Sequence, residues 1–204
     1  MKKVTNETAL LIVVMMAFLI AIGSDSDAQK GLAVQKSQDG KAVVKEYKTR
    51  TGKTIVVAES HPQGQSLSNI SVAFAGNAAS EMKFTDRDPI SKVMLGDLDA
   101  NGFDEIYIIT TSAGSGSYGN VIGLASLSDK SLSPITVPEV EEKDMKAGGQ
   151  FEGYQGHDEF EIIENSLARR FPIKAANATT RGINYKLKAG EAGFILYIKN
   201  STAY

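Results

Sequence analysis

The strongest structural signal in the chain runs from Glu105-Ile106-Tyr107-Ile108-Ile109-Thr110-Thr111 through Ser112-Ala113-Gly114-Ser115-Gly116-Ser117-Tyr118-Gly119 to Val121-Ile122-Gly123-Leu124-Ala125. The first run is rich in the β-branched and aromatic residues that strands favour, and the last run is apolar again. Small and polar residues separate the two runs. The segment therefore predicts a β-hairpin with the loop 112–119 at its tip.

The loop 112–119 has the composition of a segment that contacts another molecule. Its glycines lack a Cβ, so the backbone can take positive φ angles and approach a partner closely. Its hydroxyl groups can be presented to that partner. The glycines are Gly114, Gly116 and Gly119, and the hydroxyls come from Ser115, Ser117 and Tyr118. The same composition also fits an ordinary flexible hairpin loop, and both interpretations stay open.

The rest of the chain beyond residue 41 alternates between short strand-like runs and turns. Strands are expected at 42–47, 54–59, 70–74, 90–95, 160–164, 167–173, 183–187 and 194–198. A further strand at 132–137 contains Pro134 and is followed by Pro138, which places it at a sheet edge or makes it an extended connection. The charged segment 139–146 is expected to form a short helix or a mobile loop.

No helical period competes with this pattern, so the sequence predicts an all-β fold. Such a run of antiparallel strands can form a sandwich or a barrel, and we expect an antiparallel β-sandwich with one short helix. The domain would span residues 42–204 and follow a solvated, flexible lead at 29–41. About 176 residues suffice for one domain with a substantial core.

The N-terminus predicts export. Lys2 and Lys3 precede an apolar run from Ala9 to Gly23 that is short for a membrane span, as is typical of a secretory signal peptide. Cleavage is expected after Ala28, with cleavage after Gly23 as the alternative and an uncleaved membrane anchor as the other interpretation. The chain has no cysteine, which excludes disulfides and a lipid-modified cysteine.

Charge excludes several classes of partner. Residues 1–28 hold two of the 22 basic and three of the 24 acidic side chains, so the mature chain would carry a net charge of −1. No basic stripe offers an electrostatic basis for nucleic-acid binding, and no polybasic segment indicates attachment to a membrane surface after cleavage. A soluble periplasmic protein is therefore expected, and the sequence leaves a homodimer open.

An acidic segment lies directly before the strand-like run 105–111. Asp97, Asp99 and Asn101 alternate before Gly102, and Glu105 follows, as in calcium-binding loops. An EF-hand would need an acid at the twelfth position, which is Ile108 here. A β-type calcium loop and an ordinary tight turn both fit, so we expect no metal or other cofactor and keep these four side chains as calcium candidates.

Two further pairs of residues, His157–Asp158 and Arg169–Arg170, have side chains suited to catalysis or to ion pairing. His157 and Asp158 could serve a hydrolase with Ser115 or Ser117, but neighbours on a strand point to opposite faces and no nucleophile-elbow motif is present. His157 is instead expected to order the start of a strand through hydrogen bonds. Of Arg169 and Arg170, one is expected to face solvent and the other to pair with a carboxylate within the domain.

Three ordered blocks of this sequence resemble the periplasmic inhibitors of invertebrate-type (I-type) lysozyme. They are Asp97–Gly102 running into Ser112–Gly119, then Gly156-His157-Asp158-Glu159-Phe160, and then Leu167–Ile173. The resemblance covers about half of the mature chain, from near Ile90 to Leu187. It implies an exported β-sandwich protein of Gram-negative bacteria, without enzymatic activity, that evades host defence by blocking a lysozyme.

The resemblance also implies a site. The segment Ser115-Gly116-Ser117-Tyr118 would plug the active-site cleft of the I-type lysozyme, with Ser115 and Tyr118 as its polar contacts. A calcium- or carbohydrate-binding β module that uses the loop from Asp97 to Glu105 is the alternative, and an exported hydrolase that uses His157 is a second one.

Overall fold

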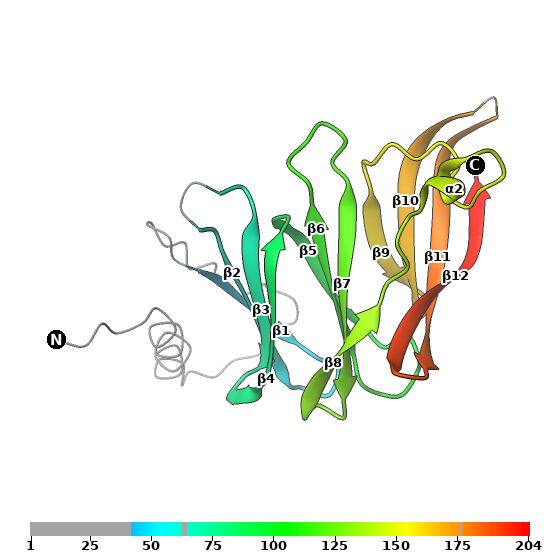
Figure 1. The fold of residues 1–204 in the computed structure, drawn as a ribbon. Helices are drawn as coiled ribbons and strands as arrows, with labels where there is room; N and C mark the ends of the chain where they lie inside the picture. The colour runs from blue at the N-terminus through cyan, green and yellow to red at the C-terminus, as the bar shows by residue number, and fades with distance from the viewer. Residues whose placement is uncertain (1–41, 63–64, 176) are drawn as a thin grey trace, which may run out of the picture. The chain divides into compact units, whose positions relative to one another are not determined.

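The computed structural model describes residues 42–62, 65–175 and 177–204. It is all-β with one short helix, as the sequence predicts. The strands are β1 (Val43–Lys48), β2 (Thr54–Ser60), β3 (Ser68–Phe74), β4 (Asn77–Arg87), β5 (Ile90–Gly96), β6 (Glu105–Thr111), β7 (Gly119–Leu127), β8 (Ser131–Thr136), β9 (Glu159–Ile163), β10 (Ser166–Ala175), β11 (Ala178–Gly190) and β12 (Gly193–Ala203), and the helix is α2 (Glu142–Met145). Figure 1 shows the strands in chain order by colour.

The strands form two sheets. The first is a four-stranded antiparallel meander with the order β1-β2-β3-β4, in which each strand pairs with the next one in the chain. Its first turn contains Gly52, whose φ of +86° is the left-handed conformation that a tight hairpin turn requires. This confirms the predicted hairpin of residues 42–59, because β1 and β2 pair from Val43–Glu59 to Lys48–Thr54.

The second sheet has eight strands in the order β5-β6-β7-β8-β12-β11-β10-β9. It curls until its two edge strands, β5 and β9, contact each other through side chains rather than through a hydrogen-bonded ladder. The Lys92 ammonium on β5 donates to the carbonyl of Phe160 on β9 at 2.8 Å. This sheet is therefore nearly closed on itself, with β5–β8 facing β9–β12 (Figure 1).

Two apolar cores lie on opposite faces of β6. Ile106 and Ile108 point to one face, where they pack against residues of the four-stranded sheet such as Val72. Tyr107 and Ile109 point to the other face, into the core inside the curled sheet. The first core also contains Ile55, Val57, Ile70, Phe74, Leu124 and Leu132, and the second contains Phe151, Phe160, Leu167, Phe171, Ile183 and Leu196. The central strand β6 is thus covered on both sides.

The structure corrects three expectations about strands. The sequence predicts 132–137 as an edge strand or an extended connection, but β8 is an interior strand. Its pairing with β12 is parallel, whereas the expected pairing is antiparallel throughout. Pro134 is tolerated because β12 pairs only with Ile135 and Thr136, beyond the proline that lacks a backbone donor. The third correction is β4, which the sequence analysis missed because its side chains are mostly polar and exposed or half-buried.

The charged segment 139–146 contains the short helix α2, which settles the choice between a helix and a mobile loop in favour of the helix. Within the described ranges, no helix combines the length and the apolar character needed to cross a membrane. The expected signal peptide (1–28), both candidate cleavage points and the expected flexible lead (29–41) lie outside the described residues.

We predict that Ile108→Ala lowers the free energy of unfolding by about 2–5 kcal/mol, because Ile108 is fully buried between the two sheets and its truncation leaves a cavity. The matched control is Ile163→Ala on β9, where the side chain is exposed and the expected loss is below about 0.5 kcal/mol. Urea denaturation with equal m-values measures both changes. Equal losses in the two variants would contradict the burial of this face of β6 against the four-stranded sheet.

Candidate functional site

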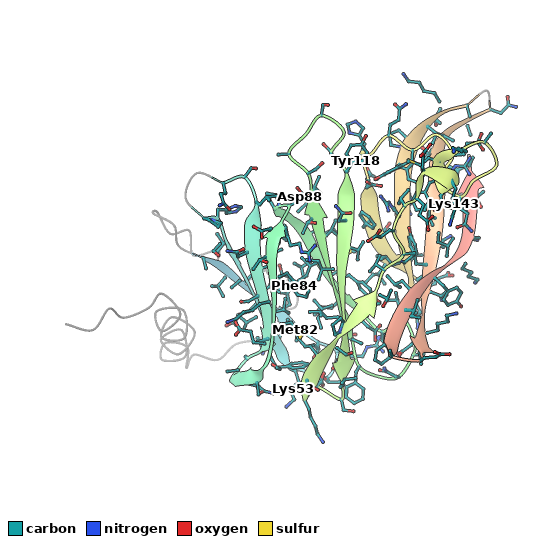
Figure 2. All side chains as sticks on the ribbon, in the orientation of Figure 1. Lys53, Met82, Phe84, Asp88, Tyr118 and Lys143 are labelled. Carbon is teal, nitrogen blue, oxygen red and sulfur yellow. The ribbon has the colours of Figure 1, made fainter. Side chains whose placement is uncertain are left out.

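The loop 112–119 connects β6 to β7, as the sequence predicts, and extends beyond the ends of both strands (Figure 1). Ser115 is exposed at its turn, and Tyr118 is 47 % exposed where the loop enters β7. Figure 2 shows Tyr118 at this end of the hairpin. The loop therefore presents one aromatic ring and several hydroxyl groups to solvent.

Hydrogen bonds fix the shape of this loop from within. The Ser112 amide donates to the Tyr118 carbonyl at 3.0 Å, and the Tyr118 amide donates to the Ser112 hydroxyl at 2.9 Å. The Ser117 amide donates to the Gly114 carbonyl at 3.0 Å, which closes a tight turn. The loop is also tied to a second loop, because the His157 amide donates to the Gly116 carbonyl at 2.7 Å. These bonds favour the interpretation of a preformed loop over a flexible one.

The glycines act differently from the expectation that they supply positive φ angles. The left-handed residue of the loop is Ser117, with a φ of +43°. Gly116 is needed for close packing, because a Cβ there would lie 2.3 Å from the Tyr118 ring. At Gly119 a Cβ would lie 2.7 Å from the Phe160 ring. The two glycines therefore allow close packing within the protein itself, and the Tyr118 ring lies folded back over Gly116.

A buried polar network lies beneath the loop. The Arg169 Nε donates to Asp158 Oδ1 at 2.7 Å, and both side chains are almost fully buried. The Tyr154 hydroxyl donates to Asp158 Oδ2 at 2.6 Å and accepts from the Arg169 guanidinium. The Gly119 amide donates to the same Asp158 oxygen at 2.7 Å. One carboxylate thus joins the end of the loop 112–119 to β10.

Aromatic rings surround the cation of this network. The Arg169 guanidinium carbon lies 4.9–5.4 Å from the ring centres of Phe151, Tyr154 and Phe160, which is cation–π geometry. Burial by itself would lower the pKa of Arg169, but the hydrogen bond and the charge of Asp158 outweigh it and raise that pKa, so the guanidinium stays charged. Burial raises the pKa of Tyr154, so its phenol stays protonated and can donate to Asp158.

The network reaches Tyr118 through a ring contact. Tyr118 and Tyr154 meet edge to face with centres 5.8 Å apart, which adds to the stability of such a pair beyond simple burial. Beside Tyr118 opens a cleft of about 510 Å³, lined in part by Asp88, Val121 and Val140, with Arg169 among its wall residues. Tyr118 therefore stands at the rim of a concavity, held from below by a charged and aromatic network.

The structure confirms that one arginine pairs inside the domain. Arg169 pairs with Asp158, whereas Arg170 points outward and makes an ion pair with Glu161 at 3.3 Å. His157 is exposed, and its ordering bond comes from its backbone amide rather than from the ring. Asp158 takes its hydrogen bonds from Gly119, Tyr154 and Arg169, and none from the adjacent His157.

The acidic loop between β5 and β6 lies at the opposite end of β6. Asp97, Asp99 and Glu105 each place one carboxylate oxygen within 4.8 Å of the other two. The fourth calcium candidate, Asn101, donates from its side chain to Asp99 at 3.0 Å. The structure therefore brings the four candidates together.

Two contributors to this acidic loop, Arg50 and Asp104, are absent from the candidates that the sequence predicts. Arg50, from the β1–β2 turn, binds Asp97 at 2.7 Å and Asp104 at 3.1 Å. The Arg50 amide also donates to Asp104 at 2.6 Å. No local signal could reveal these contacts, because about fifty residues separate the partners. Burial raises the pKa of Glu105 to about 8, and nearby Asp99 and Asp97 contribute in the same direction.

We predict that Asp158→Ala lowers the free energy of unfolding by about 3–5 kcal/mol, because it leaves the buried Arg169 cation without its partner. The control is Glu161→Ala, which removes the partner of the neighbouring Arg170. That pair is partly exposed to solvent, so the expected loss is below about 1 kcal/mol. Chemical denaturation of both variants gives the comparison, and a loss for Asp158→Ala as small as that for Glu161→Ala would refute the role of this network.

Comparison with known proteins identifies no relative of this chain. It matches no protein-family model, no curated protein and no solved structure. Two arrangements among the described residues bear on function: the fixed loop 112–119 with Tyr118 at the cleft rim, and the acidic loop at the other end of β6.

Proposed function

We propose that this chain is an exported inhibitor of an I-type lysozyme, and that it blocks the enzyme by inserting the loop 112–119 into the active-site cleft. The observation that carries the proposal is the presentation of Tyr118, an exposed ring on a loop whose backbone is fixed by hydrogen bonds and by the Asp158 network. The resemblance of three sequence blocks to the I-type lysozyme inhibitors supports the same assignment.

The chemistry of the target suits this loop. Lysozymes cleave glycosidic bonds with two carboxyl groups placed on either side of the scissile bond. A competitive plug should therefore offer hydroxyl donors that carboxylates can accept, and Ser115 and Tyr118 are such donors. The small residues around Ser115 keep the loop narrow enough for a cleft that binds a sugar chain.

Preorganisation favours tight binding. A segment that is already ordered loses less conformational entropy when it binds than a flexible one does. Tyrosine also offers a large amphipathic contact area with few rotatable bonds. Tyr118 stands at the rim of the 510 Å³ cleft, so a convex edge of the enzyme could contact both the ring and the cleft.

The proposal includes location and role. The protein would be secreted into the periplasm of a Gram-negative bacterium, where it meets lysozymes of host defence, and it would act by binding and not by catalysis. The engagement of Asp158 with Arg169, rather than with His157, supports this over the hydrolase alternative.

A lysis assay tests the proposal directly. Purified protein is added to I-type, chicken-type and goose-type lysozymes, and clearing of a bacterial cell-wall suspension is followed. We expect stoichiometric inhibition of the I-type enzyme. Unchanged lysis at excess protein with several I-type lysozymes would overturn the proposal.

We predict that Ser115→Ala and Tyr118→Ala each weaken lysozyme binding by roughly 1–3 kcal/mol, because each removes a donor from a buried enzyme carboxylate. The double variant should nearly abolish inhibition, and Tyr118→Phe separates the hydroxyl from the ring contact. Calorimetric binding constants measure these effects. His157→Ala is the control with unchanged inhibition, and melting temperatures near wild type show that the loop variants remain folded. Wild-type binding by the double variant would exclude the loop as the plug.

We also predict that Gly116→Ala weakens inhibition at least about tenfold, because the new Cβ displaces the Tyr118 ring from its position over the loop. Gly114→Ala is the matched control, since a Cβ there has no atom within 4 Å. Equal inhibition by the two variants would show that the fixed position of Tyr118 is not required.

A further inference from the structure

We propose that the acidic loop from Asp97 to Glu105 is a binding site for one divalent cation of the calcium class, with the carboxylates of Asp97, Asp99 and Glu105 as ligands. The site lies at the start of β6, away from the loop 112–119, and is independent of the proposed function. The side-chain oxygen of Asn101, at the turn of the same loop, accepts from the Phe103 amide at 2.8 Å, so we do not count it among the ligands.

The spacing of the three carboxylates suits one ion. Calcium binds oxygen ligands at 2.3–2.6 Å, so two ligands of the same ion lie at most about 5 Å apart. The oxygens of Asp97, Asp99 and Glu105 lie within 4.8 Å of one another. Three ionised carboxylates this close repel one another, and a divalent cation between them would remove that repulsion.

A second, independent observation is that the buried Glu105 side chain has one oxygen without a hydrogen-bond partner in the described ranges. Its side chain is fully buried, and its Oε2 accepts from the Leu98 amide at 2.7 Å. Its Oε1 is buried as well but has no hydrogen-bond partner among the described residues. Buried polar atoms almost always have a partner, because leaving one unpaired costs free energy. A cation held jointly with Asp97 and Asp99 supplies that partner.

Arg50 does not supply the missing partner of Glu105 Oε1. Its contacts go to Asp97 and Asp104, and its side chain is 53 % exposed, so it binds the cluster from the solvent side. Neither Asp99 nor Glu105 makes an ion pair within the described residues. Asp99 and Glu105 therefore lack a cationic partner in the described part of the chain, and the unpaired oxygen, Oε1, belongs to Glu105 itself.

The donor set selects the kind of ion. The loop offers carboxylate and amide oxygens only, since the chain has no cysteine and neither of its two histidines lies in the loop. Oxygen-only sites suit calcium and magnesium rather than zinc or copper. Calcium accepts irregular sets of six to eight ligands with water completing the shell, whereas magnesium demands a near-ideal octahedron. Asp97 and Asp99 follow β5 and Glu105 begins β6, and this irregular set of ligands suits calcium better than magnesium.

The cation would fix the position of the first residue of β6. Asp97 follows β5 and Glu105 is the first residue of β6, so one ion would join the two strands at the point where the doubly buried strand begins. The loop 112–119 lies at the other end of this strand, roughly 20 Å away for seven residues. We therefore expect the ion to raise thermal stability and to leave lysozyme inhibition unchanged.

The test is a calcium titration of the chelator-treated chain by calorimetry, together with melting temperatures in calcium and in sodium chloride of equal ionic strength. We expect one saturable site and a melting temperature raised by roughly 5–10 °C when calcium exceeds its dissociation constant a hundredfold. Magnesium should bind more weakly. Absence of both the heat and the shift at millimolar calcium would overturn the proposal.

Variants locate the ion. Glu105→Gln and Asp99→Asn should each weaken calcium binding at least about tenfold, because each removes a charged ligand. Glu191→Gln, in the exposed turn before β12, is the control with wild-type binding. Asp99 is only half-buried, so Asp99→Asn carries the test if Glu105→Gln does not fold. Wild-type calcium binding in the folded ligand variants would place the ion elsewhere and refute the site.

Discussion

The architecture depends on one strand with two apolar faces. Ile106 and Ile108 on one face of β6, and Tyr107 and Ile109 on the other, are all buried. A strand of this kind must be covered on both sides, because burial of each such side chain contributes roughly 1.5–3 kcal/mol. The four-stranded sheet covers one face, and the return of the curled sheet through β9–β12 covers the other.

The same constraint positions both candidate sites. A strand packed on both faces is rigid, so the loops at its two ends start from fixed points. At the far end the loop 112–119 is further held by the Arg169–Asp158–Tyr154 network, and at the near end the acidic loop is gathered around Glu105. At each end a part of the polar network is buried, the Arg169–Asp158 pair beneath the loop 112–119 and Glu105 in the acidic loop, and a low dielectric there strengthens each charged contact.

Local sequence patterns predicted the strands well and the assembly only in part. The hairpins were readable because period-two alternation and turn residues act over a few positions, as in the pairing around Gly52. The parallel β8–β12 pair and the side-chain contact of β5 with β9 join segments far apart in the chain, so no local pattern encodes them. The polar strand β4 carries little of the apolar signal on which strand prediction depends.

The site residues divide in the same way. The sequence predicts Ser115 and Tyr118 as candidates because they lie in a distinctive loop, and the acidic side chains because they follow a spacing. The contribution of Arg50 to the acidic loop, and of Tyr154 to the position of Tyr118, depends on tertiary contacts. The unpaired Glu105 oxygen is likewise a property of burial, which the sequence does not express.

The parallel pairing of β8 with β12 has a consequence for the order of folding. The meander β1–β4 closes only short loops and can form early, whereas the curled sheet needs Ile135 to meet Phe194, nearly sixty residues later. Folding slows as native contacts become more distant in sequence. Until β12 docks on β8, these two strands expose unpaired edges, which are templates for association with other chains. The long sequence separation of this pair therefore prolongs the exposure of two strand edges through which the chain can aggregate.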